Sequence, residues 1–421
     1  MNKKIGNIFK GDKVIWMVFF FLCMVSIVEV FSASSGLTYK SQNYVGPIAY
    51  HAGTIFIGML VAIVTLNIPC RYFKLITIPL LVVTALMLFI VLCGGGEKEN
   101  DATRWIKIFG FTIQPSEIAK GTIVLAVAQI LAAMQRENGA DRQAFKWILW
   151  ITVPTCFLIG TENLSTAALL FAVVVLMMFF GRVPNRQLLK LVGVISFIVL
   201  FTFAMVMIVG KTTTEEDPKQ VAQTEMVEKS TQKTTWIEKI LHRADTWKNR
   251  IENFIHKKDV SPQDYDLDKD AQVAHANIAI VSSSIIGKGP GRSVERDFLA
   301  QAFSDFIYAI IIEELGIIGA GFVAFLYIVL LYRCARIASR CENNFPAFLA
   351  MGLGLLLVMQ AMFNMMVAVG LAPVTGQPLP LISKGGTSTI INCAYIGVIL
   401  SISRSAKQRR DRENALKMSE V

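Results

Sequence analysis

Charged side chains are scarce in this sequence of 421 residues. Asp, Glu, Lys and Arg make up only 17% of the chain, whereas apolar residues make up 54% and the mean hydropathy is +0.52. Soluble globular proteins are usually about a quarter charged. The scarcity of charge therefore excludes an ordinary soluble protein and indicates a chain that lies largely within a lipid bilayer.

Histidine and cysteine are also few and scattered. The four histidines form no HExxH-like cluster, and none of the seven cysteines falls in residues 211–304. This distribution predicts neither a disulfide framework nor a metal site. The segment GKGPGRS, Gly287–Ser293, does not fit the GxxxxGK[ST] pattern of nucleotide-binding loops, so ATP binding is not expected.

Long apolar runs dominate the rest of the chain. About 20 apolar residues suffice to cross a bilayer. The ten candidates are Val14–Ala33, Tyr50–Asn67, Leu75–Cys93, Glu117–Met134, Ile148–Gly160, Leu164–Phe180, Leu188–Gly210, Ile307–Tyr332, Phe345–Leu371 and Thr387–Ser403. The first is too long for the apolar core of a signal peptide, which favours an uncleaved span. We therefore predict an all-α polytopic membrane protein with about ten transmembrane helices.

Lysine and arginine cluster in alternate loops, which predicts that both termini are cytoplasmic. The net charge of +10 then reflects topology and anionic lipid rather than nucleic acid. The predicted parts are a cytoplasmic N-terminus (1–13), seven spans (14–210), an extracytoplasmic loop (211–304), three spans (305–403) and a basic cytoplasmic tail (404–421). Within the loop, residues 211–234 are expected to be mobile. Apolar spacing predicts an amphipathic helix over Trp236–Ile255 and a second helix over Ala271–Ile286.

Three carboxylates stand at the start of the eighth predicted span, in SDFIYAIIIEELG. A helix starting at Ser304 would use this serine as N-cap and place Asp305 favourably in its first turn. That interpretation explains Asp305 but leaves Glu313 unexplained. On an ideal helix, Glu313 lies about 80° round and roughly 12 Å along from Asp305, while Glu314 points away. Carboxylates inside spans usually face a cavity or a partner. Asp305 would lie near the outer surface, where a half-desolvated carboxylate is a candidate general base.

Two further segments have candidate polar residues. RWIKIFGFTIQPSEIAK contains Arg104 and pairs Glu117 with Lys120 at i,i+3 spacing, which an ordinary capped helix with a salt bridge also explains. LAPVTGQPLPLISKGGTSTI combines Lys384 with two glycines just before a helix. This second arrangement fits either a simple loop or a cradle for an anion.

Four motifs in a fixed order resemble the SEDS family (shape, elongation, division and sporulation). They are RWI with QPSEIAK, NLSTA at Asn163, GKGPGRS with FLAQAFSDFIYAIIIEELG, and PVTGQPLPLISKGGTS. The forms QPSEIAK and LPLISKGG resemble the cell-division branch more than the elongation branch. Two departures are Asn163, where the family often has aspartate, and Lys384, where tyrosine is common, with Thr375 where division members have lysine.

The resemblance implies a glycosyltransferase that polymerises lipid II into peptidoglycan strands and releases undecaprenyl pyrophosphate. It implies Asp305 as the catalytic carboxylate, with Glu313 and Glu314 shaping the site. The other candidate substrate-binding residues are Arg104, Lys120, Arg243, Ser383, Lys384, Gly385 and Gly386. No tightly bound cofactor is expected, although Asp305 could hold Mg²⁺ or Mn²⁺.

The implied surroundings are those of septal cell-wall synthesis in the bacterial cytoplasmic membrane. The implied partners are the nascent glycan strand, a class B penicillin-binding protein, other divisome proteins and membrane lipids, with no nucleic acid. Two other functions remain open, a lipid II flippase and a non-catalytic scaffold for a transpeptidase. The clustering of candidate charges at the predicted outer end favours the polymerase, because a flippase should also have polar groups in its inner half.

Overall fold

The computed structural model describes residues 10–34, 46–99, 102–108, 111–137, 139–209, 271–299 and 302–419. Arg243, the mobile segment predicted over 211–234 and the amphipathic helix predicted over 236–255 lie outside these residues. The chain forms two compact units, Met1–Leu188 with Asp266–Val421, and Leu189–Tyr265. Apart from Arg243, the candidate residues considered below belong to the first unit.

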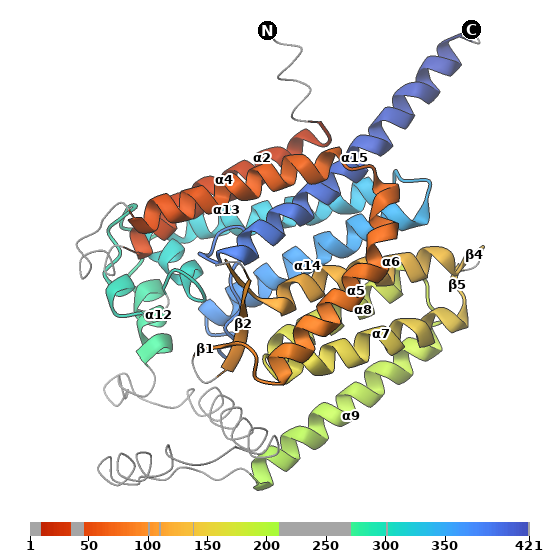
Figure 1. The fold of residues 1–421 in the computed structure, drawn as a ribbon. Coiled ribbons are helices and arrows are strands. Elements are labelled where there is room, and N and C mark those ends of the chain that lie inside the picture. The colour runs from red at the N-terminus through yellow and green to blue at the C-terminus, as the bar shows by residue number, and fades with distance from the viewer. Residues whose placement is uncertain are drawn as a thin grey trace. The chain divides into compact units, whose positions relative to one another are not determined.

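Each of the ten predicted spans coincides with a helix (Figure 1). These helices are α2 (Lys13–Ala33), α4 (Gly46–Asn67), α5 (Cys70–Leu92), α6 (Pro115–Ala133), α7 (Arg142–Gly160), α8 (Leu164–Phe180), α9 (Asn185–Val209), α13 (Ile307–Ala338), α14 (Asn344–Ala368) and α15 (Thr387–Ser419). Among the described residues, eight helices are long and apolar enough to cross a membrane, and α8 is a shorter apolar helix. The all-α, multi-span prediction is confirmed.

Short polar side chains begin several of these helices where the sequence changes from loop to apolar run. Asp12 accepts a hydrogen bond from the backbone N–H of Val14 at 2.9 Å, and Asp141 caps α7 in the same way. Asn163, the departure from the family pattern, caps α8 by accepting from the N–H of Thr166 at 3.2 Å. Capping needs no ionisable group, so asparagine fills this position as well as aspartate.

The described part of the chain contains five short strands that were not predicted. The segment between α5 and α6 forms an antiparallel sheet in the order β1 (Glu97–Glu99), β2 (Ala102–Ile108) and β3 (Phe111–Ile113). The register pairs Lys98 with Thr103 and Lys107 with Thr112. The strands β4 (Gln135–Arg136) and β5 (Gly139–Ala140) form a second pair between α6 and α7.

Helix α14 lies inside the bundle of the first unit and packs against α6, α8, α13 and α15. Helix α4 lies along α15, and α2 packs against α13 (Figure 1). The second predicted loop helix is present as α12 (Ala271–Val281), which ends five residues earlier than expected. Beyond it, the chain continues as an irregular segment with one turn of 3₁₀ helix, Glu295–Asp297, before α13.

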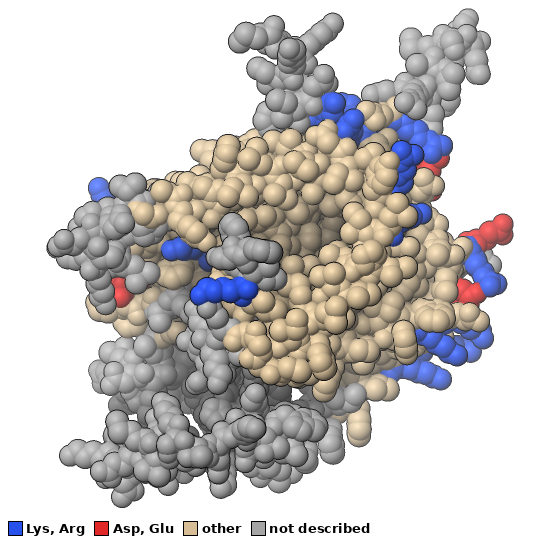
Figure 2. All heavy atoms as spheres, viewed as in Figure 1, with Lys and Arg blue, Asp and Glu red and all other residues tan. Residues whose placement is uncertain are grey.

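Basic side chains gather toward one end of the bundle. Figure 2 shows a broad surface without charge, with Lys and Arg collected where α15 leaves the bundle and near β4 and β5. Ion pairs join Arg333 to Asp12 and Arg409 to Glu342, and Arg404 donates to Asn67. We call this region the basic end.

Candidate active site

Asp305 lies in a turn before α13 rather than inside the helix. The helix begins at Ile307, and Phe306 occupies the N-cap position without a side-chain capping bond. The interpretation of Ser304 as N-cap, with Asp305 in the first helical turn, is therefore wrong. The ideal-helix angle between Asp305 and Glu313 also loses its basis, because the two residues do not share one helix.

Three successive backbone carbonyls hold this turn in place. The side-chain amide of Asn364 on α14 donates to the carbonyl of Asp305 at 2.8 Å. Ser383 Oγ donates to the carbonyl of Ser304 at 2.6 Å, and the backbone N–H of Lys384 donates to that of Phe303 at 3.0 Å. The Asp305 side chain is half-buried and accepts from Ser304 Oγ at 3.1 Å. A half-desolvated carboxylate on a fixed backbone is suited to proton transfer.

The same contacts bring Lys384 to the Asp305 turn. Lys384 Nζ lies 5.0 Å from the centroid of the Phe303 ring, and its side chain is half-buried. Partial burial lowers the pKa of Lys384 from its ordinary value, because desolvation penalises the charged form. The structure therefore joins Asp305, Ser383 and Lys384, three residues that sequence reasoning had placed in two separate motifs.

The two glycines after Lys384 lead directly into α15. Gly386 has a positive φ of 50°, and the helix starts at the next residue, Thr387. Thr387 Oγ1 donates to the carbonyl of Thr112 on β3 at 2.9 Å, which ties this helix start to the sheet. A lysine beside a helix N-terminus favours an anion, so this arrangement is compatible with the anion cradle, one of the two interpretations of the segment.

Lys120 is placed differently from the prediction. Its side chain is fully buried, with Nζ 2.7 Å from Glu117 Oε1 and 2.6 Å from Gln360 Oε1. Gln360 in turn donates to the carbonyl of Pro378 at 3.0 Å. With these partners and no exposed surface, Lys120 has no path to a substrate phosphate in this arrangement. The ordinary salt-bridge interpretation describes Lys120, and Gln360 links it to the loop after α14.

Arg104 lies on β2, and its side chain is not among those described. Strand β2 pairs with β3, which contacts the start of α15, so Arg104 belongs to the same end of the bundle as Lys384. The pyrophosphate contacts predicted for Arg104 and Arg243 stay predictions.

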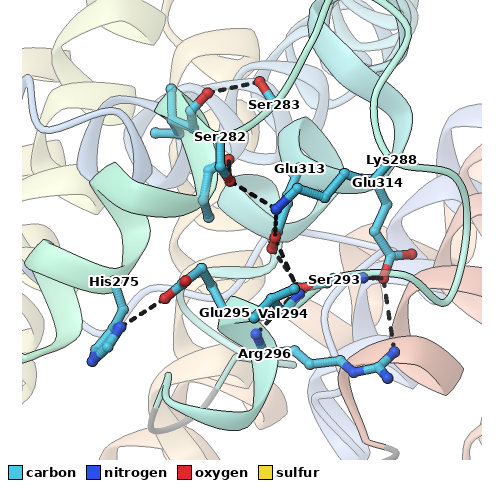
Figure 3. Close-up of polar contacts among 12 residues, drawn as sticks. His275, Ser282, Ser283, Lys288, Ser293, Val294, Glu295, Arg296, Glu313 and Glu314 are labelled. Carbon is cyan, nitrogen blue, oxygen red and sulfur yellow. Dashed lines mark hydrogen bonds and ion pairs between the residues drawn. The ribbon is translucent and has the colours of Figure 1, made fainter.

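Glu313 is fully buried and binds the segment that follows α12. It accepts from Lys288 Nζ at 2.6 Å, from the N–H of Val294 at 3.1 Å and from Ser293 Oγ (Figure 3). Both of its oxygens are thus engaged inside the protein. The expectation that Glu313 borders a cavity together with Asp305 does not match this geometry.

Glu314, which helix geometry places away from Glu313, binds the same segment. It accepts from the N–H of Gly291 at 2.8 Å and of Ser293 at 3.1 Å, and also from Ser32 Oγ of α2. Arg296 Nη1 lies 4.0 Å from its carboxylate. The segment wraps around α13 and so reaches both glutamates. The pair therefore positions residues 288–296, which agrees with a role in shaping the site.

Sequence reasoning missed the buried amides that link α14 to the site. Asn364 donates to the carbonyls of both Asp305 and Gln377, and Gln377 donates to Thr166 on α8. Gln360 and Asn364 stand four residues apart on an otherwise apolar helix and so share one face. That pair was a usable signal, because buried amides inside an apolar span require partners.

The described residues contain no group of three His, Cys, Asp or Glu side chains that could hold a metal ion. Mg²⁺ is often bound by one or two carboxylates together with substrate phosphates. Asp305 fits that mode of binding, in which the substrate completes the coordination.

Comparison with known proteins places this arrangement in a family. The profile of the FtsW/RodA/SpoVE family, described as cell cycle protein, matches residues 12–408. The chain belongs to this family. Membership confirms the resemblance recognised in the four ordered motifs.

Members of the FtsW/RodA/SpoVE family resemble the chain over nearly its whole length. A probable peptidoglycan glycosyltransferase FtsW of Geobacter metallireducens is 28% identical over 408 residues, covering 94% of this chain and 95% of the relative. The corresponding protein of Pseudomonas fluorescens is 27% identical over 387 residues, covering 90% of this chain and 84% of the relative.

Solved structures share the fold. A chain from a study of how a peptidoglycan synthase complex coordinates polymerisation and crosslinking has a TM-score of 0.69 at 22% identity, covering 94% of this chain and 99% of its own. The rod shape determining protein RodA of Thermus thermophilus has a TM-score of 0.61 at 21% identity, covering 95% of this chain and 99% of its own.

Proposed function

We propose that this membrane protein is a peptidoglycan glycosyltransferase that polymerises lipid II, with Asp305 as general base. The observation that carries the proposal is the fixed turn that holds half-buried Asp305 and that Lys384 contacts through Phe303. The names of the relatives indicate the substrate class. The site contains a carboxylate that can accept a proton, Asp305, and a cation that can stabilise a leaving group, Lys384.

The proposed reaction joins two sugars at the end of the bundle that bears Asp305. A 4-hydroxyl oxygen attacks the anomeric carbon of the second sugar, and the bond from that carbon to the pyrophosphate oxygen breaks. Asp305 takes the hydroxyl proton, while undecaprenyl pyrophosphate leaves with the bonding electrons. Lys384 and the start of α15 stabilise the negative charge that develops on the leaving group. A divalent cation, when bound, would add to that neutralisation.

The biological setting is also part of the proposal. Relatives named FtsW, together with the cell-division form of two motifs, support a septal role in the cytoplasmic membrane. A fold shared with a chain of a peptidoglycan synthase complex supports pairing with a class B penicillin-binding protein that crosslinks the strands. A scaffold with the same fold would tolerate Asp305→Asn.

Asp305→Asn tests the catalytic role. Asparagine keeps the size of the side chain and leaves the three carbonyl contacts of the turn in place, so the variant should fold normally. Polymerisation should fall by about 10²–10⁴-fold, because an amide cannot accept the proton. The measurement is glycan length on a gel after incubating purified protein with lipid II, with and without the partner transpeptidase, alongside a thermal melt.

Three outcomes would contradict the proposal. A folded Asp305→Asn variant that still forms long glycan would show that Asp305 is not the general base. A wild-type protein that forms no glycan even with its partner would favour the scaffold. Lipid II movement across vesicles without polymerisation would favour the flippase. Asp305→Glu should restore little activity, because the added methylene displaces the oxygens from the productive position.

A further inference from the structure

The segment after α12, residues 282–294, substitutes for missing hydrogen bonds of α13. Gly316 interrupts α13 with a φ of 70° and a ψ of −175°. Next to this break, the carbonyls of Glu313 and Glu314 accept from the N–H groups of Lys288 and Gly289, at 3.0 and 2.8 Å. The N–H of Ile318 donates to the carbonyl of Ile285 at 3.3 Å. Segment and helix thus form one hydrogen-bonded unit.

The backbones meet at two glycines without room for a side chain. A Cβ on Gly316 would lie 2.4 Å from the carbonyl oxygen of Ile285, and one on Gly287 would lie 2.3 Å from that of Glu314. Ile285 and Ile286 are therefore held directly against α13. The two residues are nevertheless 67% and 79% exposed.

These side chains extend a lipid-facing surface. Beside them on α13, Ile317 and Ile318 are 65% and 63% exposed, and Val281 at the end of α12 is 83% exposed. We call Val281, Ile285, Ile286, Ile317 and Ile318 the isoleucine patch. Further along α13, the surface continues through Phe322, Phe325 and Ile328, which are also exposed on this candidate membrane span. The patch is therefore continuous with the face that α13 presents to lipid.

The position of the patch along α13 places it at the edge of the hydrocarbon. Fifteen residues separate Ile318 from Arg333 at the basic end, which corresponds to roughly 22 Å of helix. A hydrocarbon core is about 30 Å thick. With Arg333 at one boundary, Ile318 and the bonded Ile285 lie within the apolar layer, near the opposite boundary.

Irregular backbone is tolerated at that depth only where its polar groups have partners. The segment meets this condition in several places. Gly287 N–H donates to Ser284 Oγ at 3.0 Å, and Ser283 Oγ donates to the carbonyl of Ile280 at 2.7 Å. Lys288 Nζ is paired with Glu313 and also donates to Ser282 Oγ at 2.9 Å (Figure 3). An ordinary water-exposed loop has no need for this degree of internal pairing.

We propose that the isoleucine patch is inserted into the lipid leaflet opposite the basic end, which is the outer leaflet in the predicted orientation. The Val281–Gly287 part of the chain is then an interfacial membrane anchor rather than a solvated loop. Exposed Arg292, a few residues further on, is placed to meet lipid phosphates at the surface. This inference concerns lipid and does not depend on the proposed catalysis.

Depth-dependent fluorescence quenching tests the insertion. The full-length protein with Cys93→Ser, which removes the exposed cysteine, is the parent. Ile286→Cys is labelled with a polarity-sensitive dye and reconstituted in vesicles of phosphatidylcholine and phosphatidylglycerol. The matched control is Asp297→Cys, whose native side chain is 52% exposed on the same connection to α13. Signal from the remaining cysteines is measured in the parent and subtracted, and thermal melts verify folding of both variants.

The dye at position 286 should emit at shorter wavelength than the dye at 297. It should be quenched by lipid with a nitroxide near the head of the acyl chain and protected from aqueous iodide, whereas the dye at 297 should show the reverse. Iodide quenching at 286 equal to that at 297 would overturn the proposal. Protection at 286 from both quenchers would also overturn it, because protein would then cover the patch, either residues 211–265 or a second chain.

Discussion

Lys384 is a cation whose charge depends on its partly buried position. Burial lowers its pKa, so at alkaline pH it loses its proton earlier than an ordinary lysine. Between the folded and the ordinary pKa, the unfolded chain binds more protons than the folded one. The free energy of unfolding contributed by this residue therefore rises with pH in that interval. Activity that needs the charge should change in the opposite direction and fall as pH rises.

Lys384→Arg tests whether the alkaline loss of activity comes from loss of the charge on Lys384. Arginine stays charged throughout the accessible pH range. If charge at this position stabilises the leaving group, the alkaline limb of the polymerisation rate should move to higher pH in the variant. The measurement is lipid II turnover against pH for both proteins, with Lys384→Met as the uncharged control, which should lose about 10- to 150-fold at neutral pH. Superimposable profiles for lysine and arginine would show that Lys384 titration does not limit the rate.

Glu29 and Glu314 are both fully buried carboxylates, yet their surroundings differ. Glu314 accepts several hydrogen bonds, including those from Gly291 and Ser293. Within the described part of the chain, neither oxygen of Glu29 has a hydrogen-bond partner. Glu314→Gln should lower the free energy of unfolding by about 1–3 kcal/mol, because an amide NH₂ would face N–H donors.

Glu29→Gln serves as the matched control, because it makes the same replacement of carboxyl by amide at a buried position whose oxygens have no hydrogen-bond partner in the described part of the chain. It should leave the melting temperature unchanged or raise it, since an unpartnered buried carboxylate is costly. Thermal melts of both variants in one detergent check the pair. Equal losses in the two variants would show that the contacts of the 282–294 segment with Glu314 contribute little.

At the scale of elements, the break in α13 depends on one residue. Gly316 has backbone angles that are almost restricted to glycine, at a cost of about 1–3 kcal/mol for other residues. Gly316→Ala should therefore lower the melting temperature and release the 282–294 segment, because its Cβ would meet the Ile285 carbonyl. Amide hydrogen exchange over residues 282–294 should speed up.

Gly321→Ala is the control on the same helix. A Cβ there has nothing within 4 Å, so alanine should be neutral or stabilise by roughly 0.5–1 kcal/mol through helix propensity. A Gly316→Ala variant as stable as Gly321→Ala would mean that the break is not required.

Long apolar runs were sufficient to predict the helices, because length and hydropathy determine a membrane span almost alone. The geometry of the candidate site was harder to predict from the sequence. The predicted span Ile307–Tyr332 begins where α13 begins, but the interpretation that used Ser304 as N-cap was wrong, because Ser304 followed by Asp305 has the composition of a cap. The buried position of Lys120 was available only as one of two interpretations. The wrapping of the segment around Glu313 and Glu314 depends on contacts between residues about 20 positions apart, for which the sequence has no local signal.

At the scale of the whole molecule, the gathering of basic residues at one end agrees with the charge rule used for topology. The rule predicts that this end faces the cytoplasm. Cysteines introduced at Asp297 and Glu137, both exposed, should therefore differ in their reaction with an impermeant maleimide. In intact spheroplasts Asp297→Cys should react and Glu137→Cys should not, while both should react after lysis.

The Cys93→Ser parent provides the background for this experiment, and each variant must retain the wild-type melt. Labelling of Glu137→Cys before lysis, with Asp297→Cys protected, would reverse the orientation. Labelling of both positions before lysis would contradict a bundle in which they lie on opposite sides.

Helix α15 runs without interruption from Thr387, next to Lys384, to Ser419 beyond the basic end. Its 33 residues correspond to a rod about 50 Å long. A rod transmits displacement and torque that a flexible tail would absorb. Mechanical load on the Arg409 end, from a bound protein or from the membrane, would therefore shift the Gly386 end against the Asp305 turn, so that the rate of chemistry on one side of the membrane could respond to force on the other.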